Sequence, residues 1–102
     1  MKYKTNKLKT LEKNRYSIFT EDLEHCILCN TPNVDINEIF MGRNRQNSMK
    51  YGLCIPLCRT HHRKYHNDRK MQLKWMQLAQ KKFEESHTNT EWMNIFHKNY
   101  KD

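Results

Sequence analysis

The chain has little of what linkers, secreted proteins and membrane spans carry. Two glycines and two prolines among 102 residues exclude a linker-like or collagenous chain. No apolar run approaches the roughly 18 residues of a membrane span, and the lysine-rich start lacks the apolar core of a signal peptide. Hydrophobic residues make up only 36% of the sequence. We therefore expect one small intracellular domain whose thin core needs an added cross-link.

Acidic residues are outnumbered. Nineteen Lys and Arg against eleven Asp and Glu leave a net charge of +8. In a domain of this size, such an excess favours a polyanionic partner, most often nucleic acid. The basic residues are not gathered on one amphipathic helix, which disfavours a membrane surface. A lysine-rich composition that serves no partner is the alternative interpretation.

The sequence divides into a basic N-terminal arm, residues 1–16, and a single domain, residues 17–102. The arm has almost no apolar periodicity, so it is either a solvated, frayed segment or a segment that contacts phosphates. Short strands are predicted over residues 16–20, 34–40 and 51–57. The polar, basic stretch 43–50 is predicted to be a loop.

The last third of the chain is predicted to be helical. Asn67 or Asp68 can cap the first helix, and Thr88-Asn89-Thr90-Glu91 fits a capping box for a second. Lys and Gln are expected on the outer side of the first helix. Its apolar residues recur at helical spacing: Met71, Trp75, Leu78, Ala79 and Phe83.

Four cysteines and six histidines stand out in so short a chain. Cys26-x-x-Cys29 and Cys58-x-x-His61 are two ligand pairs, each with a two-residue spacer, and such pairs converge on one tetrahedral Zn²⁺. A structural zinc ion would supply the missing cross-link, because its binding is coupled to folding. The alternatives are plain buried thiols or a disulfide, which is rare in reducing compartments. Cys54 lacks a partner spacing and is expected to be buried as a small hydrophobe.

His62 and His66 follow directly after the second ligand pair. If a helix begins here, the two side chains lie one turn apart on the same face and can share a metal ion. Because zinc already takes His61, these two histidines would form a second, open site.

With these residues in place, the chain resembles an HNH nuclease of the ββα-metal type, in particular a phage and bacterial group of recombination-enhancement nucleases. The resemblance covers most of the chain, and its matching segments are residues 15–18, 22–23, Cys26-x-x-Cys29, 38–45, Ser48, 51–53, 56–58, 61–62, 66–67, 80–84 and 96–100. It implies an α+β fold, a small zinc-stabilised ββα-metal domain with C-terminal helices. It also implies a metal-dependent DNA endonuclease of a phage or bacterial cytoplasm, without a small-molecule cofactor.

The resemblance assigns roles residue by residue. His62 and His66 would hold the catalytic divalent ion (Mg²⁺, Mn²⁺ or Zn²⁺), and the first strand would supply the general base that deprotonates a water. The middle asparagine of the motif would be Asn47, with Asn44 as the alternative. Four basic side chains would contact the DNA backbone: Arg43, Arg45, Lys50 and Arg63.

Asn37 departs from the pattern, because relatives usually begin this strand motif with His, as His-Glu-Ile-Phe or His-His-Ile-Phe. Asparagine cannot accept a proton at neutral pH. If position 37 supplies the general base, the site should have almost no catalytic activity. If it supplies a metal ligand, metal affinity should fall instead. Glu38 is a substitute for either role. The alternative function is therefore a catalytically inactive HNH-derived module that binds DNA or inhibits a host protein. His97, where relatives carry Gly, is a smaller departure.

Overall fold

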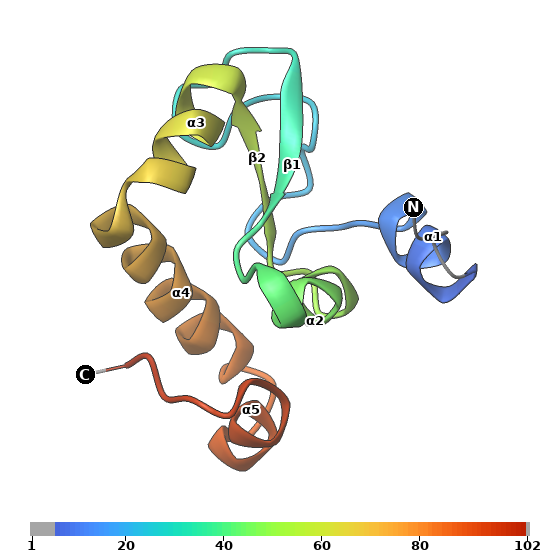
Figure 1. Ribbon diagram of the computed structural model, residues 1–102, viewed down its shortest axis with the longest axis vertical. Helices are drawn as coiled ribbons and strands as arrows, with labels where there is room; N and C mark the ends of the chain where they lie inside the picture. Colours follow the sequence, from blue (N-terminus) through green and yellow to red (C-terminus); the bar gives the residue numbers. More distant parts are fainter. Residues whose placement is uncertain (1–5, 102) are drawn as a thin grey trace.

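The computed structural model describes residues 6–101 of the chain. This part contains an antiparallel hairpin and five α-helices (Figure 1). Strand β1 (Val34–Glu38) pairs with β2 (Cys54–Cys58), with Val34 opposite Cys58 and Glu38 opposite Cys54. Helix α3 (Arg59–Asn67) follows β2 without a break. The fold is thus α+β, with the expected order of two strands and a helix. Both strands are shorter than predicted.

The segment between the strands is helical, where a loop was predicted. A 3₁₀ turn (Gly42–Asn44) leads into α2 (Arg45–Lys50). The buried Ser48 hydroxyl donates to the Phe40 carbonyl and accepts from the Phe40 N–H, both at 2.9 Å. These two hydrogen bonds hold α2 against the end of β1. They connect residues eight apart, so the local composition of a polar, basic stretch did not reveal them.

The predicted caps of the C-terminal helices are confirmed. Asp68 caps α4 (Arg69–Phe83), its carboxylate accepting from the Met71 N–H at 3.1 Å. Thr88 and Glu91 form the capping box of α5 (Asn89–Phe96). Each cap satisfies backbone N–H groups that the first turn of a helix leaves without a partner.

The core lies between the hairpin and these helices. Phe40 packs against Trp92 and Phe96 of α5, with ring centroids 5.5 and 4.6 Å apart. The buried hydrophobic cluster includes Ile39, Phe40, Leu53, Ile55, Leu57, Tyr65, Met76, Ala79, Phe83, Trp92 and Phe96.

Within residues 6–101, no helix combines the length and the apolar character that crossing a bilayer requires.

Two expectations for α4 were wrong. Leu78, predicted in the core, is 38% exposed, whereas Gln72 and Gln80, predicted on the outer side, are buried. The Gln72 amide donates to the Tyr65 carbonyl at 2.7 Å, and the Gln80 side-chain oxygen accepts from the Tyr100 N–H at 2.7 Å. Both amides are buried because they bond backbone groups that would otherwise lack partners.

The N-terminal segment also differs from expectation. Residues Asn6–Lys13 form helix α1 rather than a frayed arm, while residues 1–5 of the predicted arm lie outside the described part. No strand forms at residues 16–20. Instead, the Ile18 N–H makes a single hydrogen bond to the Gly52 carbonyl at 2.9 Å.

Four charged side chains, named here the Glu12–Arg45 cluster, dock α1 beside α2 (Figure 1). Arg45 binds Glu12 at 2.6 Å and Glu38 at 3.0 Å. Arg15 binds Glu38 at 2.7 Å. The cluster therefore joins α1, the end of β1 and the start of α2. Its residues are far apart in the sequence, so the sequence alone did not indicate that the arm would fold back.

The two glycines provide a matched test of this packing. Both have positive φ, +64° at Gly42 and +71° at Gly52, but only at Gly52 would a Cβ overlap the Tyr16 ring and lie 2.9 Å from Ile18 Cγ2. Gly42→Ala should cost about 1–2 kcal/mol from backbone strain. Gly52→Ala should cost about 1–3 kcal/mol more, from overpacking. Urea denaturation of the metal-loaded chain measures both, and equal losses would contradict the packing of residues 16–18 on Gly52.

Candidate metal centre

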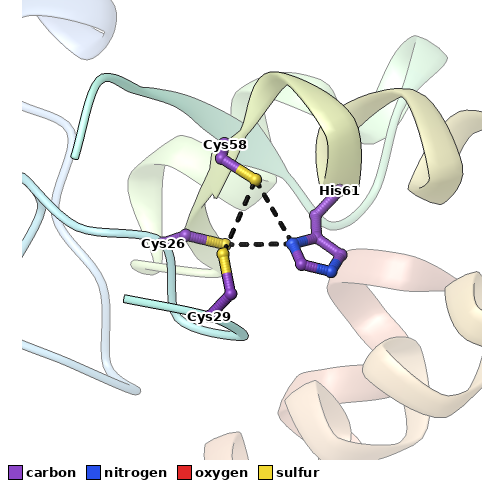
Figure 2. A group of neighbouring side chains, drawn as sticks. All are labelled: Cys26, Cys29, Cys58 and His61. Carbon is purple, nitrogen blue, oxygen red and sulfur yellow. Dashed lines mark hydrogen bonds between the residues drawn. The ribbon is translucent and has the colours of Figure 1, made fainter. Parts of the chain in front are cut away.

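Cys26, Cys29, Cys58 and His61 converge on one point, as Figure 2 shows. Their ligand atoms all lie within 4.8 Å of one another. The four cysteines of the chain are free, and Cys54, as predicted, is buried apart from this group. The predicted set of ligands is therefore brought together.

The local backbone explains this convergence. In the Cys26–Cys29 turn, the Asn30 N–H donates to the Cys26 carbonyl and the Cys26 N–H to the Thr31 carbonyl, both at 2.8 Å. The Ile27 N–H donates to the Pro56 carbonyl at 2.9 Å. Pro56 can accept although it cannot donate to the ladder, and it lies in a two-stranded sheet, where both strands are edges. This bond ties the Cys26–Cys29 turn to β2 at Pro56, two residues before Cys58.

The spacing of the ligand atoms fits a tetrahedral ion. Bonds of about 2.3 Å to sulfur and 2.0–2.1 Å to nitrogen place two sulfurs about 3.8 Å apart, and sulfur about 3.5 Å from nitrogen. The sulfurs of Cys29 and Cys58 are 3.7 Å apart. His61 Nδ1 lies 3.5 Å from the Cys26 sulfur and 3.3 Å from the Cys58 sulfur. Little movement would be needed to bind a metal ion here.

The thiols differ in how readily they ionise. A hydrogen bond from the Thr31 hydroxyl lowers the pKa of Cys29 to about 6. The His61 backbone N–H acts in the same direction on the pKa of Cys58, but desolvation and the neighbouring thiols of Cys29 and Cys26 outweigh it and raise that pKa. Several thiolates cannot gather here without a cation, and a divalent metal supplies the compensating charge.

The second group, the Asp35–His62–His66 group, joins β1 to α3. His62 Nε2 and His66 Nε2 are 3.0 Å apart, and His62 Nδ1 lies 3.2 Å from an Asp35 carboxylate oxygen. A proton on Nδ1, shared with Asp35, leaves the lone pair of His62 Nε2 turned toward His66, and a metal-binding histidine usually has its other nitrogen bonded to a carboxylate in this way. Sequence reasoning missed Asp35. The period of two along a strand, which puts residues 35 and 37 on one face, was the available signal.

The two candidates for the base lie on opposite faces of β1. Asn37 shares the face of Asp35 and is 2% exposed. Its Nδ2 is buried and makes no hydrogen bond within the described residues. Glu38 points the other way and is held by Arg15 and Arg45. Its carboxylate is thus paired with two guanidinium groups rather than turned toward α3.

The remaining predicted residues are spread over the surface around α2 and α3. Asn47 Nδ2 donates to Asn44 Oδ1 at 3.3 Å, so both candidates for the middle asparagine lie together at the start of α2. Arg45 is engaged in the Glu12–Arg45 cluster. Arg43, Lys50 and Arg63 are exposed.

Comparison of the chain with protein-family models, with curated proteins and with solved structures finds no match.

The Cys₃His centre predicts the outcome of two cysteine substitutions. Cys29→Ser should abolish binding of one metal ion per chain, with zinc the expected ion, and leave a chain that unfolds or aggregates, because metal binding and folding are coupled. Cys54→Ala, at a buried cysteine outside the centre, should retain one ion. Elemental analysis and circular dichroism measure both. A well-folded, metal-free Cys29→Ser chain would contradict the structural role.

The second group predicts an effect of Asp35 on metal binding. If His62 and His66 hold a divalent ion, as the resemblance implies, Asp35→Asn should weaken binding of Mn²⁺ there about 10–100-fold, because the partner that orients the imidazole is lost. Asp22→Asn is the control, since Asp22 makes a similar 2.9 Å contact with His25 Nδ1 elsewhere on the surface. Mn²⁺ titration followed by electron paramagnetic resonance gives the affinities. Equal affinities in the two variants would exclude a role for Asp35.

Proposed function

We propose that the chain is a metal-dependent DNA endonuclease of the HNH, or ββα-metal, type, acting in the cytoplasm and stabilised by Zn²⁺ at Cys26, Cys29, Cys58 and His61. The observation that carries the proposal is the Asp35–His62–His66 group, with two imidazole nitrogens 3.0 Å apart on the helix that follows the hairpin. The two nitrogens are within hydrogen-bond distance of each other, and both are close enough to bind one divalent ion in place of that contact.

In this proposal each side chain has a defined task. His62 and His66 hold the divalent ion through Nε2, and Asp35 orients His62. The ion, when bound, stabilises the charge that develops on the phosphate and the leaving oxygen. A water attacks the phosphorus, the bond to the leaving oxygen breaks, and a base must take the proton of the water. Arg43, Lys50 and Arg63 are available to contact the DNA backbone.

The proposal lacks a side chain that can act as the general base. This lack favours a second candidate function. Asn37 cannot accept a proton, and Glu38 is paired with Arg15 and Arg45 on the opposite face of β1. A catalytically inactive HNH-derived module, which binds DNA or inhibits a host protein, would have this combination. Tight DNA binding without cleavage by every variant below would favour it.

Restoring an imidazole at position 37 tests the proposal. Asn37→His should raise the rate of plasmid nicking about 10²–10⁴-fold, because it adds a general base of suitable pKa on the face of β1 that carries Asp35. The assay uses saturating Mn²⁺, so that a change in metal affinity does not appear as a change in chemistry.

Two controls accompany this variant. Asn37→Gln keeps an amide and should stay as slow as the natural chain. Asn37→His combined with His62→Ala should lose the gain, because the ion is no longer held. If no variant nicks DNA with Mg²⁺ or Mn²⁺, the endonuclease proposal fails. A natural chain that is already fast, and unchanged by Asn37→His, would place the base elsewhere.

A further inference from the structure

Two hollows lie along α4, one where α3 meets it and one nearer its C-terminal end. The first, about 420 Å³, lies beside the Cys₃His centre, and the second, about 300 Å³, shares Lys74 with it. We name the pair the α4 groove. Its lining includes Lys64, Lys70, Lys74, Trp75, Lys81 and Lys101.

The lysines of the α4 groove form a stripe. Lys70, Lys74 and Lys81 recur at spacings of four and seven residues, which puts them on one face of α4. Lys64 adds a fourth charge from α3, and all four are exposed. Together they hold unpaired positive charge, because none makes an ion pair with a carboxylate in the part of the chain the structure describes.

Acidic side chains are outnumbered in the groove. Asp68, the cap of α4, also lines the first hollow and contributes one negative charge. Lys101, at the far end of the groove, is paired with Glu84. Four lysines against one carboxylate leave the groove positive, and a polyanion complements it.

Trp75 adds an aromatic surface to this positive groove. It packs edge-on against Phe19, with centroids 5.4 Å apart, and is only partly buried. The other tryptophan, Trp92, is fully buried, with its ring N–H bonded to the Lys98 carbonyl. A ligand in the groove would therefore change the surroundings of Trp75 and leave those of Trp92 unchanged.

We propose that the α4 groove binds the phosphodiester backbone of duplex DNA as a second contact surface, an inference that rests on the proposed function for its ligand. On α3, Lys64 faces the groove, while His62 and His66 are each turned about 160° from it around the helix axis. The groove is thus separate from the proposed ion site. From Lys70 to Lys81 the stripe runs about 16 Å, the rise of about five nucleotides at 3.4 Å each.

The test compares two double variants that each remove two charges. Lys70→Gln with Lys74→Gln acts in the groove. Lys82→Gln with Lys98→Gln acts outside it, since Lys82 pairs with Glu85 and Lys98 lies over the Tyr100 ring. Affinity for a labelled 20-base-pair duplex is measured from 50 to 200 mM salt, with zinc-loaded protein and no added Mg²⁺ or Mn²⁺.

The groove variant should lower the slope of log affinity against log salt by about two, and the control by much less. The advantage of the natural chain over the groove variant should thus shrink about tenfold across this salt range. DNA should quench tryptophan fluorescence in the natural chain and not in Trp75→Phe. If Lys70→Gln with Lys74→Gln unfolds, Lys64→Gln with Lys81→Gln replaces it.

Equal slopes in the two double variants, with no response from Trp75, would overturn the inference whatever the nicking assay gives. Conversely, a loss of slope confined to the groove variant supports the inference even if Asn37→His never cuts DNA. In that case the proposed endonuclease fails and the DNA-binding surface stands. The two proposals are therefore tested separately.

Discussion

Cys58 and His61 lie where β2 becomes α3, and their ligand atoms cluster within 4.8 Å of those of Cys26 and Cys29 in the preceding turn. Cys58 is both the last residue of β2 and the N-cap of α3. A metal ion at this point would fix the direction in which the helix leaves the strand. In a chain with so few apolar residues, such a cross-link would replace core that the sequence cannot supply.

The position of the second group depends on this junction. Because the direction of α3 is set at Cys58 and His61, the next residue, His62, and His66 one turn later come to face β1. The register of β1 against β2 then determines which side chains lie beside His62 and His66. A shift by one residue would turn Asp35 to the other face of the sheet and bring Glu38 to the side of α3. The same register keeps Glu38 with Arg15 and Arg45, so the two faces of β1 carry separate electrostatic systems.

The sequence allowed prediction of those features that depend on neighbours along the chain. The ligand pairs, the caps at Asp68 and Thr88, and the helical pairing of His62 with His66 are set by spacings of two to four residues. Features held by distant partners were missed: α2, which depends on Ser48 reaching Phe40, and the docking of α1 through Glu12 and Arg45. Burial of Gln72 and Gln80 was missed for the same reason, since their backbone partners come from other elements.

Two residues, His97 and Asn37, depart from the pattern that the resemblance implies. His97, where the resemblance implies glycine, ends α5 with φ of +60°, a conformation that glycine adopts without strain and other residues at a cost of about 1–2 kcal/mol. Asn37 has a buried amide nitrogen that makes no well-formed hydrogen bond within the described residues, with the Tyr65 phenol as its polar neighbour. The first departure affects only a helix end. The second is on the face of β1 that carries Asp35, so its unsatisfied hydrogen-bonding capacity belongs to the region where the proposed chemistry would occur.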